Sequence, residues 1–427
     1  MTEMLQSGVI KPSTSPWSSP PVLVRKQDGT LRYAIDYRLL NKVTVKNSFP
    51  IPAISDCLYY LQGNQVFSKL DAASAFWMIP MDEDDAPKTA FQTRFGLYEF
   101  TRMPFGLTNV PASFSAAIHS IFEDILYKIV VCYLDDIIVP SADTPTHFLA
   151  LQITLHRLMI KGAKLKPFKY LFFQKHVDVL GRIATGYSLS MADKDKKVVK
   201  EWPTPKTLKQ IASFVGFASY HRQFVKDFAD IAIPLTDLTG AKAKFKWTEQ
   251  EMKAFKELVK ALTSPPMLAL PKLIGTFILD TDCSLKAMGA CLNQMQDSVE
   301  RVVSYASVTL SSTEENYCAT RRELLAVVFF CHYFRHYLIG DPYIVRTDHS
   351  SLTWLMNFRN AEGQLLRWIN SLADYDLRIV HRKGELHGNA DALSRLLLDP
   401  NHLKKHVPLE ELPCKGCKFC KRAYSKL

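Results

Sequence analysis

Two adjacent aspartates, Asp135 and Asp136, stand between apolar runs in the segment KIVVCYLDDIIVPS. The apolar runs predict a buried β-hairpin that carries both acids at its turn. Because an unpaired buried carboxylate costs several kcal/mol, acids at this place require either solvent at the turn or a bound cation. Aspartate is also common in plain exposed turns, so the segment alone is compatible with both interpretations.

A third acid favours the metal-binding interpretation. Asp71 ends a predicted strand in QVFSKLDAASAFWMIP, and the small residues after it allow a ligand to approach closely. Three carboxylates can hold two divalent ions about 4 Å apart, which would activate a primer hydroxyl and stabilise a leaving group in phosphoryl transfer. Mg²⁺, or Mn²⁺ in its place, is expected because small hard cations prefer carboxylate oxygens.

Four more acids stand in the C-terminal part of the chain, each in a different predicted element. Asp282 in FILDTDCS and Asp348 in YIVRTDHS end strands, and Asp391 begins the segment ADALSR. Glu323 lies on a long predicted helix, and the residues that share its helix face at three- and four-residue spacing are apolar. A lone acid on such a face requires a partner, whereas acids that merely decorate a surface do not.

The elements that position the first three acids form an α+β domain. Short β-branched and aromatic runs between residues 20 and 140 predict strands, with a helix around Ala112–Leu126. An amphipathic helix at 149–161 and a region of strands and turns at 177–189 follow. We expect this domain to end near Met191.

A helical region is predicted at 193–262, where Thr248 is a plausible N-cap and Glu251 its capping-box partner. After the breaker SPPM, the strands FILDTD, RVVSYAS and YIVRTD accompany a long helix and predict an α/β domain with a mixed sheet. The tail is basic and contains a group of cysteines and histidines that fits either a zinc site or a solvated basic tail: Cys414, Cys417, Cys420, His402 and His406.

Length and charge narrow the class of protein. A chain of 427 residues is too long for one ordinary core. Its net charge of +11 favours a polyanionic partner, although solubility alone would also explain it. The longest apolar stretch, Leu324–Cys331, is too short to span a bilayer. Nine cysteines, an odd number of which six are scattered through apolar segments, suggest reduced thiols. We therefore expect no membrane partner and a cytoplasmic protein with access to the nucleus that is not secreted.

The first 262 residues resemble the fingers, palm and thumb of the reverse transcriptases of gypsy-group long-terminal-repeat retrotransposons. The phrases GVIKPSTSPWSSPPVLVRKQDGTLRYAIDYRLLNKVT, FPIP, FSKLDAASAF, PKTAFQTRFGLYEFTRMPFGLTNVPASF, YLDDIIV and GFASYHRQFVKDFADIAIPLTDL carry the resemblance in this order. The resemblance implies a right-hand polymerase fold. It also implies that the chain opens inside the fingers, without their first residues.

The resemblance assigns roles to individual residues. The triad Asp71, Asp135 and Asp136 would bind the catalytic metal ions. Lys26 and Arg32 match positions that grip the triphosphate of a deoxynucleotide (dNTP). Two aromatic residues complete the nucleotide pocket: Phe76 matches the steric gate that would collide with a ribose 2′-hydroxyl, and Phe105 stands where retroviral enzymes carry glutamine.

Residues 263–396 resemble RNase H, through the phrases TDCS, RRELLAV, RTDHSSL and HGNADALSR. The resemblance implies a metal-binding quartet of Asp282, Glu323, Asp348 and Asp391 that cleaves RNA in RNA·DNA hybrids. Asp280 shares its strand face with Asp282 by alternation, and Asp282 is preferred because it matches the TDxS phrase. His381 stands ten residues before Asp391, where retroviral enzymes carry a histidine that assists product release, although it also fits a solvated loop.

Four regions follow from these observations: fingers and palm at 1–191, a helical thumb or connection at 192–262, an RNase H-like domain at 263–396 and a basic cysteine-containing tail at 397–427. The expected function is an RNA-directed DNA polymerase with RNase H activity that binds RNA and DNA template-primers, RNA·DNA hybrids and dNTPs. A non-catalytic nucleic-acid-binding remnant is the alternative. An RNA-dependent RNA polymerase would share the palm acids but conflicts with Phe76.

Overall fold

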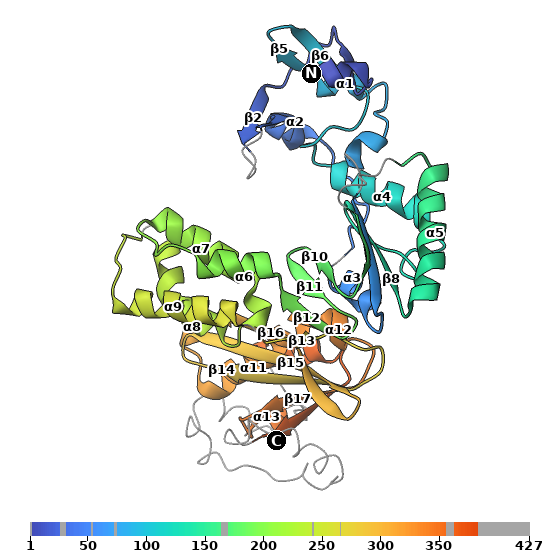
Figure 1. Cartoon of the computed structure of the whole chain (residues 1–427). Coiled ribbons are helices and arrows are strands. Elements are labelled where there is room, and N and C mark those ends of the chain that lie inside the picture. Colours follow the sequence, from blue (N-terminus) through green and yellow to red (C-terminus); the bar gives the residue numbers. More distant parts are fainter. Residues whose placement is uncertain are drawn as a thin grey trace. The chain divides into compact units, whose positions relative to one another are not determined.

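The fold was obtained as a computed structural model (Figure 1). The structure describes residues 2–25, 31–52, 54–71, 75–163, 170–240, 243–264, 266–355 and 363–382. Lys26, Asp391 and the cysteine-containing tail lie outside these residues. None of the helices formed by the described residues is long and apolar enough to cross a membrane.

The chain divides into two compact units. The first contains residues 1–179 and 184–187, and the second contains residues 180–183 and 188–427. The helices of residues 193–263 thus belong to the same unit as the C-terminal sheet. Two short strands lie where the chain passes from one unit to the other, β10 (Val177–Val179) and β11 (Arg182–Ala184).

The first unit begins with a three-stranded sheet of order β1-β6-β5 and a β2-β3 hairpin. Tyr37, Phe91 and Phe100 are buried in the small core beneath this sheet. The elements of this part are α1 (Thr2–Gln6), β1 (Ile10–Pro12), β2 (Pro21–Arg25), β3 (Leu31–Ile35), α2 (Arg38–Val43), η2 (Ala86–Thr89), β5 (Phe91–Thr93) and β6 (Gly96–Phe100).

A second sheet of the first unit, of order β7-β8-β4-β9, carries the expected palm acids. Its core contains Leu70 of β4, Phe114 of α4 and Ile137 of β8, all essentially inaccessible to solvent. The elements are α3 (Ile54–Leu61), β4 (Val66–Asp71), η1 (Ala75–Met78), α4 (Val110–Phe122), β7 (Val131–Tyr133), β8 (Asp136–Ser141), α5 (Thr144–Ile160) and β9 (Leu171–Gln174).

Two helices of this unit begin or end at residues that differ from those predicted from the sequence. Helix α5 begins five residues before the predicted 149, because the Asp143 side chain caps it by accepting from the Thr146 amide, and a proline stands in its first turn. Helix α4 ends at Phe122, four residues before the predicted end. Both limits are set by local capping and turn geometry rather than by hydrophobic periodicity.

The first half of the second unit contains four helices, α6 (Asp193–Lys200), α7 (Leu208–Tyr220), α8 (Phe228–Thr236) and α9 (Glu249–Thr263), and two 3₁₀ turns, η4 (Arg222–Phe224) and η5 (Asp237–Thr239). The predicted capping box of α9 is confirmed, since the Thr248 amide donates to Glu251 at 2.6 Å and both halves of the box are present. Strands β12 (Ser188–Met191) and β13 (Leu268–Ala269) pair antiparallel within this unit.

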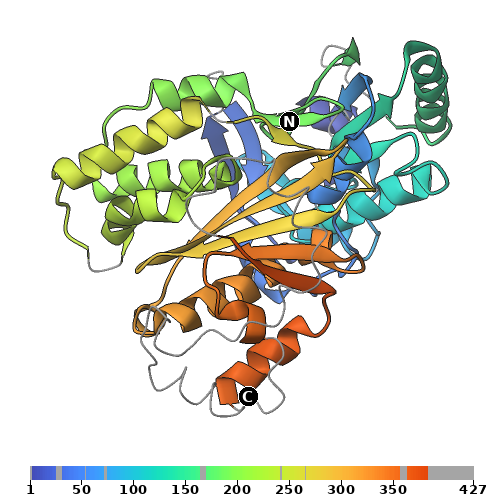
Figure 2. The ribbon, with the colours of Figure 1, turned by 90° about the horizontal axis from the view of Figure 1, so that it is seen from below.

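A five-stranded sheet of order β16-β15-β14-β17-β18 forms the rest of the second unit (Figure 2). Strands β14, β15 and β16 pair antiparallel, whereas β14, β17 and β18 are parallel, so the predicted mixed sheet is confirmed. The elements are β14 (Phe277–Cys283), β15 (Ala287–Gln296), β16 (Val299–Thr309), α10 (Ser312–Glu315), α11 (Ala319–Tyr333), α12 (Arg335–Leu338), β17 (Tyr343–Thr347), α13 (Leu352–Leu355), α14 (Gly363–Leu372) and β18 (Leu377–His381).

Candidate functional site

The YLDD segment forms the tight turn between β7 and β8. Tyr133 and Asp136 are partners across the hairpin, which leaves Leu134 and Asp135 as the two turn residues. Leu134 has φ of +50°, a backbone conformation that is costly for a side chain of its kind and that clusters at functional sites. Asp135 is exposed, and Asp136 is half-buried at the start of β8.

Asp71 reaches the same place through strand pairing. Strands β4 and β8 are antiparallel, and Asp71 is the direct partner of Asp136. Directly opposed residues project to the same face of a sheet, so their carboxylates share a face. The pairing thus brings Asp71 beside a pair of acids that follows it by more than sixty residues in the sequence. Among the described residues, however, the oxygens of these three acids do not meet within 4.8 Å of one another.

Lys69 is a member of this site that the sequence analysis missed. Its ammonium donates to Asp136 Oδ2 at 2.7 Å and to the Asp178 carbonyl at 2.8 Å. Burial raises the pKa of the Asp136 carboxyl above its ordinary value, and the Lys69 cation opposes that rise. A signal was present, because Lys69 lies two residues before Asp71 and therefore on the same strand face.

The two aromatic residues of the expected nucleotide pocket lie together. Phe76 packs edge to face against Phe105, with ring centroids 5.1 Å apart, and against Phe114 of α4 at 5.5 Å. Phe114 is fully buried and anchors Phe76, whereas Phe105 is 41% exposed. The expected triphosphate contacts are less fully described: Arg32 lies on β3 opposite Val24, and Lys26 falls outside the described residues.

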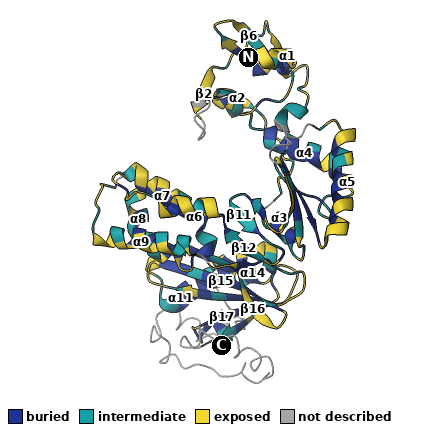
Figure 3. Cartoon of the chain, viewed as in Figure 1, coloured by how far each residue is buried: buried dark blue, intermediate teal, exposed yellow. Residues whose placement is uncertain are grey.

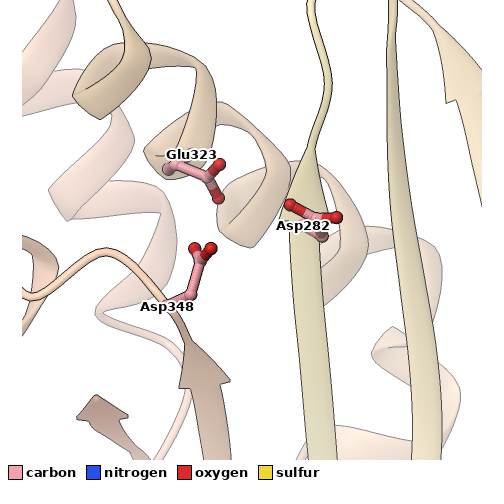
Figure 4. Close-up of side chains that lie close together, drawn as sticks. All are labelled: Asp282, Glu323 and Asp348. Carbon is pink, nitrogen blue, oxygen red and sulfur yellow. The ribbon is translucent and has the colours of Figure 1, made fainter. Parts of the chain in front are cut away.

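The second acidic site lies at one edge of the mixed sheet (Figure 4). Strands β14 and β17 are parallel, with Asp280 opposite Arg346, and two further steps of this register place Asp282 beside Asp348. Glu323 reaches the same point from α11, which packs against β14. Ligand atoms of Asp282, Glu323 and Asp348 all lie within 4.8 Å of one another.

The surroundings of Glu323 fit a bound cation. The residue is only 7% exposed, and its Oε2 is buried without a hydrogen-bond partner among the described residues. Burial, together with the charges of Asp282 and Asp348, raises the pKa of the Glu323 carboxyl to about 8. Three carboxylates at this distance repel one another, and a divalent cation is the partner that would relieve both the repulsion and the orphaned oxygen.

Asp280 has a different role from Asp282. The buried Arg346 guanidinium binds both oxygens of Asp280 and also donates to Glu300, at 2.5 and 3.0 Å. Asn293 donates to Asp280 Oδ2 at 2.8 Å as well. Asp280 is therefore occupied by a structural ion pair, and Asp282 is the acid of this strand that faces Glu323 and Asp348.

Two histidines lie around Asp348. His381 is the last residue of β18 rather than part of a loop, and its Nε2 lies 3.0 Å from the Asp348 carbonyl oxygen. His349 is buried, and its Nε2 lies 2.8 Å from the hydroxyl of Thr320, one turn before Glu323 on α11. This contact, which no sequence pattern predicted, ties together the two segments that carry Asp348 and Glu323. The fourth expected ligand, Asp391, lies outside the described residues.

Sequence comparisons match both acidic regions. The family described as reverse transcriptase (RNA-dependent DNA polymerase) matches residues 24–184, and the RNase H-like domain found in reverse transcriptase matches residues 273–375. The retrovirus-related Pol polyprotein from transposon 297 of Drosophila melanogaster is 37% identical over 94% of this chain and 38% of its own length. The transposon Tf2-3 polyprotein of Schizosaccharomyces pombe is 32% identical over 94% of this chain and 30% of its own length. The chain thus spans about a third of these two relatives.

Solved structures show the same fold. A foamy viral protease-reverse transcriptase in complex with double-stranded DNA aligns with a TM-score of 0.79 at 24% identity and covers 89% of this chain and 68% of that one. The same enzyme in complex with an RNA/DNA hybrid aligns with a TM-score of 0.78 at 23% identity, covering 90% of this chain and 52% of that one. The mixed helices and sheets described above are those of a reverse transcriptase with an RNase H-like domain, as the sequence predicted.

Proposed function

We propose that this chain belongs to the gypsy-type long-terminal-repeat retrotransposon Pol polyproteins, with a reverse transcriptase domain and an RNase H-like domain, and that it is an RNA-directed DNA polymerase and an endoribonuclease H. The observation that carries the proposal is the presence of two separate acidic sites in one chain. One lies on the β4-β8 strand pair with the YLDD turn, and the other at the edge of an RNase H-like sheet. Asp71, Asp135 and Asp136 lie inside the matched reverse transcriptase region, and Asp282, Glu323 and Asp348 lie inside the matched RNase H-like region.

In the polymerase site, Asp71, Asp135 and Asp136 would hold the divalent ions, for which Mg²⁺ is the proposed species. Such ions would supply charge neutralisation of the phosphates and activation of the primer 3′-hydroxyl. Lys69 holds the Asp136 carboxylate in place through its 2.7 Å contact. The chain itself therefore orients at least one metal ligand before any ion binds.

The same site would select deoxynucleotides. Phe76 is held by the buried Phe114 on one side and by Phe105 on the other, so its ring has little freedom to move aside. A rigid ring beneath the sugar would exclude a 2′-hydroxyl by steric contact. We also propose Lys26 and Arg32 as triphosphate contacts, on the strength of the motif alone.

In the RNase H site, Asp282, Glu323 and Asp348, together with Asp391, would hold divalent ions that supply an activated water for phosphodiester hydrolysis. The Thr320–His349 contact holds α11 against the segment after β17, and so fixes Glu323 relative to Asp348. We propose His381 as an accessory residue because its ring contacts the backbone of a ligand.

Nucleic acids are the proposed partners of both sites. The aligned foamy viral structures contain double-stranded DNA or an RNA/DNA hybrid, and we infer that this chain binds the same two classes together with dNTPs. The net charge of +11 supports a polyanionic partner.

Primer extension tests the proposal. A DNA primer annealed to an RNA template should be extended with dNTPs and Mg²⁺, but not with ribonucleotides, and Asp135→Asn should abolish extension. In parallel, Asp282→Asn should abolish cleavage of the RNA strand of a hybrid while leaving extension intact. Binding without either reaction would instead identify a non-catalytic nucleic-acid-binding protein, and extension by ribonucleotides only would identify an RNA polymerase.

A further inference from the structure

The segment before helix α9 carries an aromatic series that runs from the core to the surface. Phe214 of α7 is fully buried and packs against Phe255 of α9, with centroids 4.7 Å apart. Phe255 contacts Trp247 edge to face at 6.2 Å, and Trp247 lies parallel to Phe245, at 7° and 6.3 Å. Phe245 is 44% exposed at the end of the series. An exposed ring is thus held in a fixed orientation by a core-anchored tryptophan.

Lysines surround this exposed ring. Lys244 and Lys246 flank Phe245 in the sequence AKFKW, and both are exposed. Exposed residues recur along α9 (Figure 3). Among them, Lys253, Lys256 and Lys260 stand at three- and four-residue spacing and therefore share one side of the helix. A groove of about 800 Å³ runs along this side, and its lining includes Trp247, Met252 and the three lysines.

The acids of this surface do not cancel its charge. Glu251 is occupied by the capping box with Thr248, and Glu257 lies 4.0 Å from Lys253. Glu249 is the remaining acid of the groove. Five exposed lysines therefore outnumber the acids beside them.

We infer that this surface, made of Phe245, Trp247 and the exposed lysines of 244–260, binds single-stranded nucleic acid. An oriented exposed aromatic ring offers a stacking platform for a base, and neighbouring cations meet the backbone phosphates. An acidic peptide would use the lysines equally but has no need of a flat exposed ring between them. This surface contains none of the acids of the two sets, and stacking and phosphate contacts need no metal ion, so the inference goes beyond the proposed catalytic function.

Fluorescence anisotropy of a labelled oligo(dT) with the full chain in EDTA tests the inference, because catalysis at either acidic site is then irrelevant. The triple variant Lys253→Gln, Lys256→Gln, Lys260→Gln should raise the Kd about tenfold and should lower the slope of log K against log salt by about 2. The matched control Lys197→Gln, Lys200→Gln, Lys286→Gln removes the same charge from exposed positions of the same unit and should change the Kd less than about twofold.

A second pair of variants separates stacking from packing. Phe245→Ala should weaken binding about tenfold, whereas Phe245→Tyr should retain it. If Phe245→Ala unfolds, Phe245→Leu keeps apolar contact with Trp247 but cannot stack and should show the same loss. Equal affinities of the lysine triple variant and its matched control would overturn the inference. Unchanged affinity in both Phe245→Ala and Phe245→Leu, or lysine-dependent binding of polyglutamate in place of the oligonucleotide, would overturn it as well.

Discussion

Asp71 and Asp136 face each other directly across strands β4 and β8. Since side chains alternate along a strand, a register shift of one residue would turn Asp136 away from Asp71 and would also remove the Lys69 contact. The buried Leu70 and Ile137, which are also direct partners, fix this register because slippage would expose them. The geometry of the polymerase site is therefore set by the core of the sheet beneath it.

Replacing Lys69 by methionine should make primer extension more dependent on pH and Mg²⁺. Lys69 opposes the burial that raises the pKa of Asp136, so its loss would leave more of this carboxyl protonated near neutral pH. A protonated carboxyl cannot serve as a metal ligand. The Mg²⁺ concentration for half-maximal extension should rise severalfold at pH 6.5 and much less at pH 8.5. Lys69→Arg keeps the cation and should resemble the wild type, while a lower Mg²⁺ requirement would show that Lys69 competes with the metal instead.

Replacing Phe76 by valine should relax selection against ribonucleotides. The smaller side chain no longer occupies the space of a 2′-hydroxyl, so the ratio of ribonucleotide to deoxynucleotide incorporation should rise about tenfold or more. Loss of the ring contacts with Phe105 and Phe114 should also lower the unfolding free energy by roughly 1 to 3 kcal/mol. Single-nucleotide insertion kinetics give the ratio, and Phe76→Tyr serves as the control that keeps the ring. An unchanged ratio in Phe76→Val would show that Phe76 does not select against ribonucleotides in the nucleotide pocket.

Two neighbouring aspartates of β14 should behave in opposite ways. Asp282→Asn should reduce cleavage of the RNA strand of a hybrid at least about a hundredfold without loss of stability, because it removes a metal ligand and a like charge beside Glu323. Asp280→Asn should retain cleavage but lower the unfolding free energy by roughly 1 to 3 kcal/mol, because the buried Arg346 loses one of its two carboxylate partners. Cleavage assays and urea unfolding measure the two effects. Loss of cleavage in Asp280→Asn, with cleavage retained in Asp282→Asn, would show that Asp280 is the metal ligand.

Local features of this chain could be predicted from its sequence. The capping box of Thr248 and Glu251 depends on residues three apart, and the YLDD hairpin depends on one continuous segment. Strand β15 was missed, because AMGACLNQMQ mixes small, polar and apolar residues and has neither a clear alternation nor many β-branched side chains. This strand forms through its two neighbours, β14 and β16, which supply pairing on both edges.

The pairing partners within the sites depend on contacts between distant segments. Lys69 and Arg346 each precede an expected ligand by two residues, so alternation places them on the right face, but only the register shows which acid each one binds. Which of Asp280 and Asp282 faces the other acids likewise depends on the strand register and not on the local sequence. Both share a strand face, and the position of Arg346 on the adjacent strand separates them.

The charge state of Glu323 predicts how the stability of the metal-free protein depends on pH. Its pKa is about 8 in the folded protein and near 4.5 when exposed. Between these values the folded state retains a proton that the unfolded state has lost, so stability should fall as pH rises from about 4.5 to about 8. Above the folded pKa, the full cost of ionising a buried carboxyl beside Asp282 and Asp348 is present.

Glu323→Gln should remove this dependence, because a neutral amide is never forced to ionise. In EDTA, the variant should match the wild type near pH 4.5 and should be more stable at pH 8 by on the order of 4 kcal/mol, as measured by urea unfolding. Adding Mg²⁺ at pH 8 should stabilise the wild type and not the variant, since a bound cation replaces the proton as the partner of Glu323. The exposed Glu315→Gln is the matched control and should show neither effect. A stability difference that is the same at both pH values would mean that Glu323 does not ionise within this range, and its burial would then be a matter of packing rather than of a cation site.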